Sequence, residues 1–210
     1  LLDEVTRELA GRFAAAVKRP PREIHEYPSA AGVIIRKSAE AMEILSLGDC
    51  ELITAAGAAG ATALGIDDRL RVRDRGTALA MRAVRDEGAQ SWKEARKLLW
   101  PRFRTARANL NQPGGYPVFS IIPPPAEMVS IKVLAVPAGA PMLLASDGFM
   151  RLVEIFERYD RASLMAAVLQ RGDSSLHDEL RELEAADGEC LQYPRTKPSD
   201  DATALLLAAG

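Results

Sequence analysis

The chain has 210 residues, of which 48% are hydrophobic and 27% charged, a composition typical of one globular domain rather than a disordered or membrane-embedded chain. The formal net charge is −2, so composition gives no support for nucleic-acid binding through a broad basic surface. Two cysteines, Cys50 and Cys190, are too few for a disulfide framework and indicate a reducing, cytoplasmic setting, and the apolar runs are too short to span a membrane.

The first quarter of the chain reads as one helix followed by strands. Apolar residues recur at steps of three and four from Leu2 to Val17, which predicts an amphipathic helix that ends before Pro20. Short apolar runs then predict strands at residues 31–36, 42–47 and 51–54. Residues 38–40 are expected to form the turn between the first two strands. The second and third strands are expected to form a hairpin with its tight turn at Asp49.

The middle of the chain is predicted to be helical, over residues 77–86 and 92–110, with Pro101 splitting or kinking the second helix. That second helix is markedly basic. We interpret its charges as a solvated helix face that covers apolar neighbours, and they are Lys93, Arg96, Lys97, Arg102, Arg104 and Arg107.

The segment Pro113-Gly114-Gly115 is a strong break. After it, extended stretches are predicted at residues 116–121, 129–135 and 142–145. Helices are then predicted at 150–159, 161–170 and 175–186, and a last strand at 202–208. Because strands are grouped with strands and helices arrive together, the order favours a single mixed α+β domain over a repeated βαβ unit.

Aspartates stand at three predicted strand ends. Asp49 follows the strand at 42–47, Asp147 follows the strand at 142–145, and Asp200 precedes the last strand. A carboxylate at the end of a buried strand needs a partner, and several such ends can meet at one sheet edge and share a divalent cation. An oxygen-only donor set fits Mg²⁺ or Mn²⁺. The alternative is that each aspartate is an ordinary turn or helix-cap residue.

Four segments, in order, resemble the protein phosphatase 2C family of metal-dependent Ser/Thr phosphatases, in its bacterial branch. Gly48-Asp49-Cys50 resembles the family's Gly-Asp-Ser motif. The segment Leu143-Leu144-Ala145-Ser146-Asp147-Gly148 is similar to its Leu-Leu-x-Ser-Asp-Gly segment. Asp200-Asp201-Ala202-Thr203 is similar to its Asp-Asn-x-Thr, and residues 111–120 to its Asn-x-Pro-x-Gly-Tyr stretch. The resemblance covers essentially the whole chain.

The resemblance implies a fold, a reaction and a set of site residues. The fold would be a four-layer αββα sandwich of two antiparallel sheets flanked by helices. The reaction would be hydrolysis of phosphate monoesters on Ser/Thr phosphoproteins by a metal-activated water at a centre of two Mn²⁺ or Mg²⁺ ions. Asp147 and Asp200 match ligands of that centre, and Asp49 matches the aspartate that some members use for an additional metal. No protein side chain is assigned as a nucleophile. The partner would be a phosphorylated protein, with no nucleic acid and no membrane, and the oligomeric state is open.

The sequence also departs from the family pattern. The family places an acidic pair and an Asp-Gly segment on two strands before the first helix, and this sequence has neither before its first predicted helix. Residues 1–210 are therefore expected to be an N-terminally incomplete domain with an incomplete two-metal centre. Asp201 stands where the family has Asn. Arg151 replaces a frequent Asp and is expected to bring positive charge near the additional metal.

Two further hypotheses therefore stay open beside the phosphatase. One is a phosphatase-like interaction or regulatory domain that keeps the fold without activity. The other is an α+β domain whose aspartates are all structural. The substrate and the choice between Mn²⁺ and Mg²⁺ are not readable from these residues, and neither is the role of region 55–111.

Overall fold

A computed structural model of the chain describes residues 2–37, 41–54, 62–64, 68–135 and 137–208. Its strands pair antiparallel throughout. A three-stranded sheet has the order β2-β3-β7, formed by Gly32–Lys37, Met42–Leu47 and Ile131–Leu134. A four-stranded sheet has the order β5-β4-β8-β9, formed by Thr62–Leu64, Glu51–Thr54, Pro141–Ala145 and Ala204–Ala208. A short pair, β1 and β6, joins Ser29–Ala30 to Phe119–Ser120.

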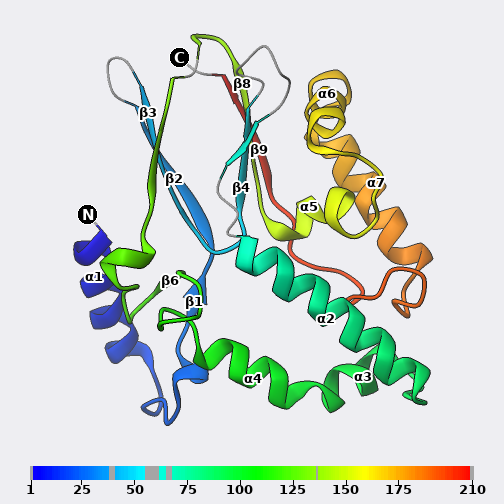
Figure 1. The fold of residues 1–210 in the computed structure, drawn as a ribbon. Coiled ribbons are helices and arrows are strands. Elements are labelled where there is room, and N and C mark those ends of the chain that lie inside the picture. The colour runs from blue at the N-terminus through cyan, green and yellow to red at the C-terminus, as the bar shows by residue number, and fades with distance from the viewer. Residues whose placement is uncertain (1, 38–40, 55–61, 65–67, 136, 209–210) are drawn as a thin grey trace.

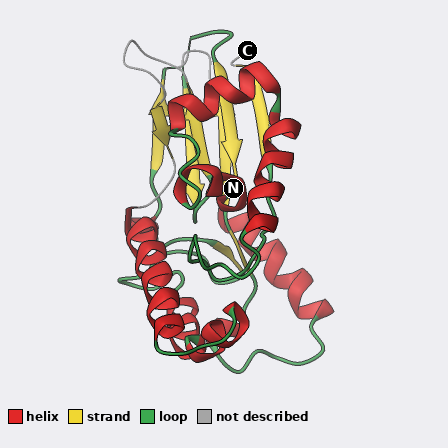
Figure 2. Cartoon of the chain, turned by 90° about the vertical axis from the view of Figure 1, so that its right-hand side faces the viewer, coloured by secondary structure: helices red, strands yellow, loops and turns green. Residues whose placement is uncertain are grey.

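The two larger sheets face each other, and helices lie on the outer side of the four-stranded sheet (Figure 1). Helix α1 (Leu2–Ala16) lies on the side of the three-stranded sheet and contacts β6. Three helices lie on the other side, in front of the four-stranded sheet in Figure 2, and they are α5 (Asp147–Glu154), α6 (Arg161–Arg171) and α7 (Asp173–Ala186). The predicted α+β fold, with antiparallel sheets flanked by helices, is confirmed.

The sequence of strand β8 does not alternate between apolar and polar residues, and the packing of the strand explains why. Met142 packs against β3 and β4 in the cluster between the two sheets, whereas its neighbour Leu143 packs against the helices. Successive side chains of a strand point to opposite faces, and both faces of β8 are covered. The larger cluster, on the helix side, contains fully buried Phe149 of α5 and Leu180 of α7. The core therefore fixes the end of β8, where α5 begins.

The prediction that the second and third strands form a hairpin is wrong. Strand β3 pairs with β2 and β7, and β4 pairs with β5 and β8, so Gly48-Asp49-Cys50 carries the chain from one sheet to the other. Both strands are buried on at least one face, and either arrangement satisfies the same local pattern. The predicted pairing of β2 with β3 is confirmed, and its turn at 38–40 lies outside the described residues.

A helical arm projects beside the sheets (Figure 1), made of α2 (Asp68–Asp86), α3 (Trp92–Leu98) and α4 (Trp100–Ala108). Pro101 lies in the first turn of α4, so the predicted split is confirmed. Met81 of α2 and Ala95 of α3 are buried against Leu99 and Phe103, which holds the arm together. No helix in the described part of the chain is long and apolar enough to cross a membrane.

The extended stretch expected at 116–121 forms regular strand only at Phe119–Ser120. Asn111 explains the difference, because its side-chain amide takes the place of a neighbouring strand. Its Oδ1 accepts from the Val118 N–H at 2.8 Å, and its Nδ2 donates to the carbonyls of Val118 and Ile122 at 3.1 and 2.7 Å. The backbone of this segment is thus satisfied by a buried side chain.

Candidate functional site

Three aspartates from separate segments lie along one cavity. Strands β8 and β9 pair with Ala145 opposite Ala204, so Asp147 just after β8 and Asp200 just before β9 lie at the same end of the sheet. Asp49 precedes β4, which pairs with β8 at that same end. All three line a cavity of about 400 Å³. The structure therefore brings together the residues that the sequence singled out, although their role as metal ligands stays a prediction.

Close backbone packing fixes the turn that carries Asp147. Ser146 donates its N–H to the Thr203 carbonyl, and its hydroxyl accepts the Thr203 N–H, both at 3.0 Å. A Cβ placed on Gly148 would lie 1.9 Å from the Asp201 carbonyl oxygen, so only glycine fits. Gly148 is the second residue of helix α5 and has no positive φ, so its role is this close approach and not an unusual backbone conformation.

Asp147 is not the cap of helix α5. Ser146 occupies the N-cap position and makes no side-chain cap hydrogen bond, because its hydroxyl is turned to Thr203. Asp147 is the first residue of the helix, and it has no ion-pair partner in the described part of the chain. A negative charge at a helix N-terminus is favourable, but this position alone does not explain the neighbouring carboxylates.

Burial and neighbouring acidic residues raise the pKa of both Asp147 and Asp49. Burial by the surrounding protein, then the charges of Asp49 and Asp200, raise the pKa of Asp147 to about 6, although its side chain is still reached by solvent from the cavity. Burial raises the pKa of Asp49, and the charge of Asp74 on α2 adds to it. Like charges held close together disfavour ionisation, and a bound cation would relieve that repulsion.

Asp200 differs from the other two because cationic side chains already hold it. Arg151 of α5 donates from Nη2 to Asp200 Oδ2 at 3.0 Å and from Nη1 to Glu184 of α7 at 2.7 Å. Lys197 forms a second ion pair with Asp200. Arg151 and Glu184 are 8% and 3% exposed, so this pair is almost entirely shielded from water, whereas Lys197 is 40% exposed. The expected positive charge of Arg151 therefore acts directly on Asp200.

The donor chemistry fits a hard divalent cation at Asp147 and Asp49. Both carboxylates lack an ion-pair partner among the described residues, and burial and nearby carboxylates disfavour their charged forms. Carboxylate oxygens are the ligands that Mg²⁺ and Mn²⁺ prefer. Asp200 fits less well, since Arg151 and Lys197 share its oxygens. Within the ranges that the structure describes, no three acidic, His or Cys side chains stand close enough together to hold a metal ion.

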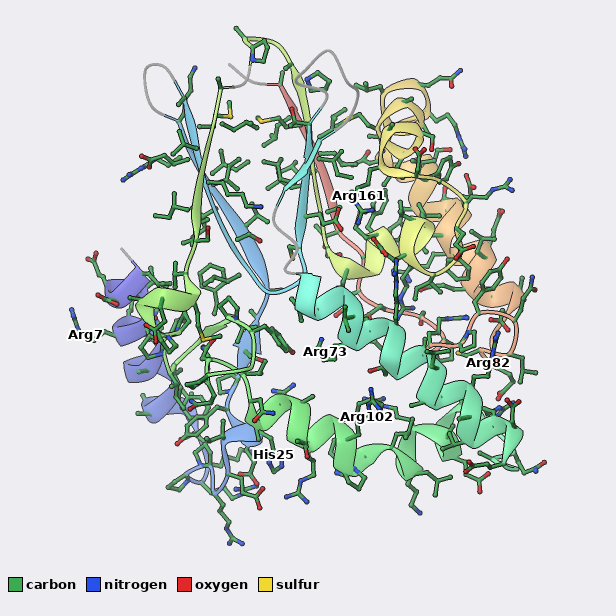
Figure 3. The ribbon with its side chains drawn as sticks, viewed as in Figure 1. Arg7, His25, Arg73, Arg82, Arg102 and Arg161 are labelled. Carbon is green, nitrogen blue, oxygen red and sulfur yellow. The ribbon has the colours of Figure 1, made fainter. Side chains whose placement is uncertain are left out.

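The cavity also contains residues that sequence reasoning missed. Arg73 is on α2 (Figure 3). Its guanidinium lies over the ring of Tyr116, 4.2 Å from its centroid, and pairs with Asp74 at 3.3 Å. Tyr116 belongs to the Pro-Gly-Gly-Tyr segment, where a Cβ on Gly115 would lie 1.7 Å from the Asn109 carbonyl oxygen. Nothing in the local pattern singles out Arg73, but that glycine pair before an aromatic residue is a signal of tight backbone packing.

The cysteines are expected to be unreactive in the metal-free protein. Burial, then the charges of Asp49 and Asp147, raise the pKa of the Cys50 thiol to about 11, and burial raises that of Cys190. Because the thiolate is the nucleophile, alkylation of Cys50 by iodoacetamide at pH 8 with chelator present should be roughly a hundredfold slower than that of free cysteine. Mass spectrometry over time measures this rate. Alkylation at the free-cysteine rate would contradict the expectation and reopen a thiol nucleophile.

No family model matches the chain, and neither does any curated protein. Among solved structures it is similar to PppA, described as a key regulatory component of T6SS in Pseudomonas aeruginosa, with 18% identity and a TM-score of 0.49 over 100% of this chain and 66% of that one. It is also similar to the Mycobacterium tuberculosis serine/threonine phosphatase PstP/Ppp, with 13% identity and a TM-score of 0.47 over 96% and 66%.

A third similar structure is the catalytic domain of serine/threonine protein phosphatase PstP in complex with two manganese ions, with 12% identity and a TM-score of 0.43 over 97% of this chain and 80% of that one. The chain thus spans 66% of the length of the first two structures. Two of the three are described as Ser/Thr phosphatases, the class of protein that the sequence resembles. Identities and TM-scores this low assign no function by themselves.

Proposed function

We propose that this chain is a protein phosphatase 2C domain that hydrolyses Ser/Thr phosphate monoesters on proteins with Mn²⁺ or Mg²⁺ as cofactor. One observation carries the proposal. Asp49, Asp147 and Asp200, which are far apart in the sequence and each part of a family-like motif, line a single cavity at one end of the sheet. Ligands of one cation must come from segments that meet at one place, and these three aspartates meet that requirement.

The proposal gives each side chain a role. Asp147 and Asp49 would hold the cation, while Asp200, oriented by Arg151 and Lys197, would stand at its flank. When bound, the cation supplies a Lewis acid for the phosphoryl group and lowers the pKa of an attacking water. The protein substrate enters through the cavity beside α2 and α4. The free thiols of Cys50 and Cys190 support a reducing, cytoplasmic compartment for this single domain.

Full-length protein is expected to hydrolyse a phosphothreonine peptide in a reaction that stops with chelator and returns with Mn²⁺ or Mg²⁺. The reason is that the described carboxylates supply binding groups for a cation but no nucleophile of their own. Released phosphate measures the rate, with a peptide phosphorylated on tyrosine as the comparison substrate. Turnover that persists in chelator, with bound metal absent by elemental analysis, would contradict the proposal.

A second candidate function is an inactive phosphatase-like interaction domain. The ion pairs of Asp200 favour it, because a carboxylate neutralised by Arg151 and Lys197 needs no metal to be stable. Full-length protein that binds phosphopeptide but releases no phosphate at saturating Mn²⁺ would favour this reading. Metal-dependent turnover would exclude it.

A further inference from the structure

Arg102 on α4 is an exposed cation that lines the cavity and has no ion-pair partner among the described residues. Its neighbours on the same helix are engaged, since Arg104 pairs with Glu23 at 2.7 Å and Arg107 donates to the carbonyls of His25 and Tyr27 at 3.1 Å. Arg102 has no hydrogen bond or ion pair in the described part of the chain, and it lines the same cavity as Asp147. Arg102 is exposed, as the interpretation of a solvated helix face expects, and it also lines the cavity.

Glycine on the opposing helix makes room for this side chain. Arg102 extends from α4 towards α2 (Figure 3), and a Cβ on Gly76 of α2 would lie 3.0 Å from its Nη2. Arg73 and Gly76 are three residues apart on α2 and therefore share a face of the helix. Arg73 thus lies one turn away from Gly76, where the Arg102 guanidinium approaches α2. The Arg73 guanidinium is held over Tyr116 and is partly neutralised by Asp74. Both guanidinium groups therefore line the same cavity, and only that of Arg73 has an ion-pair partner among the described residues.

The cavity has charged groups at both ends and apolar residues such as Phe103 and Met150 between them in its lining. Asp49 and Asp147 lie at the sheet end, and Arg73 and Arg102 lie where α2 and α4 face each other. A volume of about 400 Å³ is larger than one phosphate group requires and is within the range of ordinary ligand sites. A phosphate placed at the carboxylates with a cation would leave the charge of Arg102 unmatched. A second anionic group on the same ligand would match it.

We propose that Arg102, together with Arg73, binds an anionic side chain next to the phosphorylated residue of the substrate, and so selects acidic phosphopeptides. The inference rests on the proposed function, because it assumes that a phosphopeptide occupies the cavity. A planar guanidinium donates two parallel hydrogen bonds to a carboxylate or a phosphate, which is why arginine suits this task. The anionic side chain is a glutamate, an aspartate or a second phosphorylated residue.

Direct binding tests this inference without relying on turnover. Three fluorescent phosphothreonine peptides would be compared, with alanine, glutamate or phosphoserine on both sides of the phosphothreonine. Each would be titrated with full-length protein, once in chelator and once in Mn²⁺. Fluorescence anisotropy measures the dissociation constants. The glutamate peptide is expected to bind roughly tenfold more tightly than the alanine peptide, as a charge-assisted pair would give. A gain only with phosphoserine would identify the second phosphate as the ligand of the subsite.

Two variants separate the subsite from general charge. Arg102→Gln should abolish the preference for anionic flanks, whereas Arg102→Lys should retain part of it because the charge remains. Arg82→Gln is the matched control, since Arg82 is on the same arm, at the other end of α2, and does not line the cavity (Figure 3). A preference that survives in Arg102→Gln, or that falls equally in Arg82→Gln, would overturn the inference. Selective binding without turnover would instead remove the phosphatase proposal and leave the subsite standing.

Discussion

Replacing Asp147 with Asn is expected to abolish metal-dependent turnover while stabilising the metal-free protein. The substitution keeps the shape of the side chain but removes one charge from the acidic edge, so Mn²⁺ affinity should fall at least tenfold and turnover by orders of magnitude. In the metal-free protein the same charge is unfavourable, because burial, Asp49 and Asp200 disfavour it. A structural aspartate would show neither effect, since Asn caps a helix about as well as Asp.

The stabilisation has a defined pH dependence. The folded pKa of Asp147 is about 6 against an ordinary value of 3.8, so the folded protein loses stability as pH rises from about 4 to 6 and the carboxylate is forced to ionise. The Asp147→Asn variant does not lose this stability, because its side chain does not ionise. Its advantage in free energy of unfolding should be near zero at pH 4 and on the order of 1 kcal/mol at pH 7, after allowance for solvent screening of this exposed side chain.

Thermal unfolding in chelator at pH 4 and pH 7 measures this difference, and Mn²⁺ titration measures affinity. Asp160→Asn is a matched control, because Asp160 caps helix α6 by accepting the Ser163 N–H at 2.7 Å and its pKa is lowered. Its charge is favourable in the folded protein, so its removal should not stabilise at pH 7. An Asp147→Asn protein with undiminished turnover would remove Asp147 from the proposed metal site.

Replacing Arg151 with Met is expected to lower stability and, at the same time, to tighten Mn²⁺ binding. The substitution leaves Glu184, 3% exposed, with Arg181 as its remaining ion-pair partner among the described residues, and breaking a buried pair costs about 3 kcal/mol. For a domain of this size the melting temperature should fall by about 5–10 °C. Asp200 would lose a competing guanidinium, so its oxygens become more available to a metal ion.

Lower stability together with tighter Mn²⁺ binding would distinguish a role of Arg151 in setting metal affinity from a purely structural role. If Arg151 served packing alone, a loosened site would bind Mn²⁺ no better than before. Arg158→Met is the control for losing an arginine ion pair, because Arg158 is 64% exposed where it pairs with Glu179 and should contribute under about 1 kcal/mol. The double variant Arg151→Met with Glu184→Gln should recover part of the lost stability, which a double-mutant cycle would quantify.

Local patterns were sufficient for most of the fold. Pro101 ends one helix and begins the next because it lacks an N–H, and this is visible from one residue. The run that became β8 is apolar at successive positions, which is typical of a strand covered on both faces. The aspartates could be placed at strand ends for the same reason, because each strand and its terminal charge are neighbours in the sequence.

Contacts between distant segments could not be predicted in this way. Whether β3 and β4 form a hairpin or belong to different sheets depends on which other strands arrive to pair with them, and the link Gly48-Asp49-Cys50 is compatible with both. The pairing of Arg151 with Asp200 and the stacking of Arg73 on Tyr116 arise from elements that fold back from elsewhere in the chain. An arginine in a helix has the same local sequence signal whether it faces solvent or a cavity.

The order of the three aspartates along the chain has a consequence for biosynthesis. Asp49 leaves the ribosome early, Asp147 much later, and Asp200 only after the helices that cover the four-stranded sheet have been made. Strand β9, which carries Asp200 to the site, pairs only with β8 among the described strands and is added at the edge of the sheet. A nascent chain that already has β4, β8 and α5 therefore presents Asp49 and Asp147 without the third carboxylate. The acidic edge is completed only when β9 docks and Arg151 gains Asp200 as its second partner.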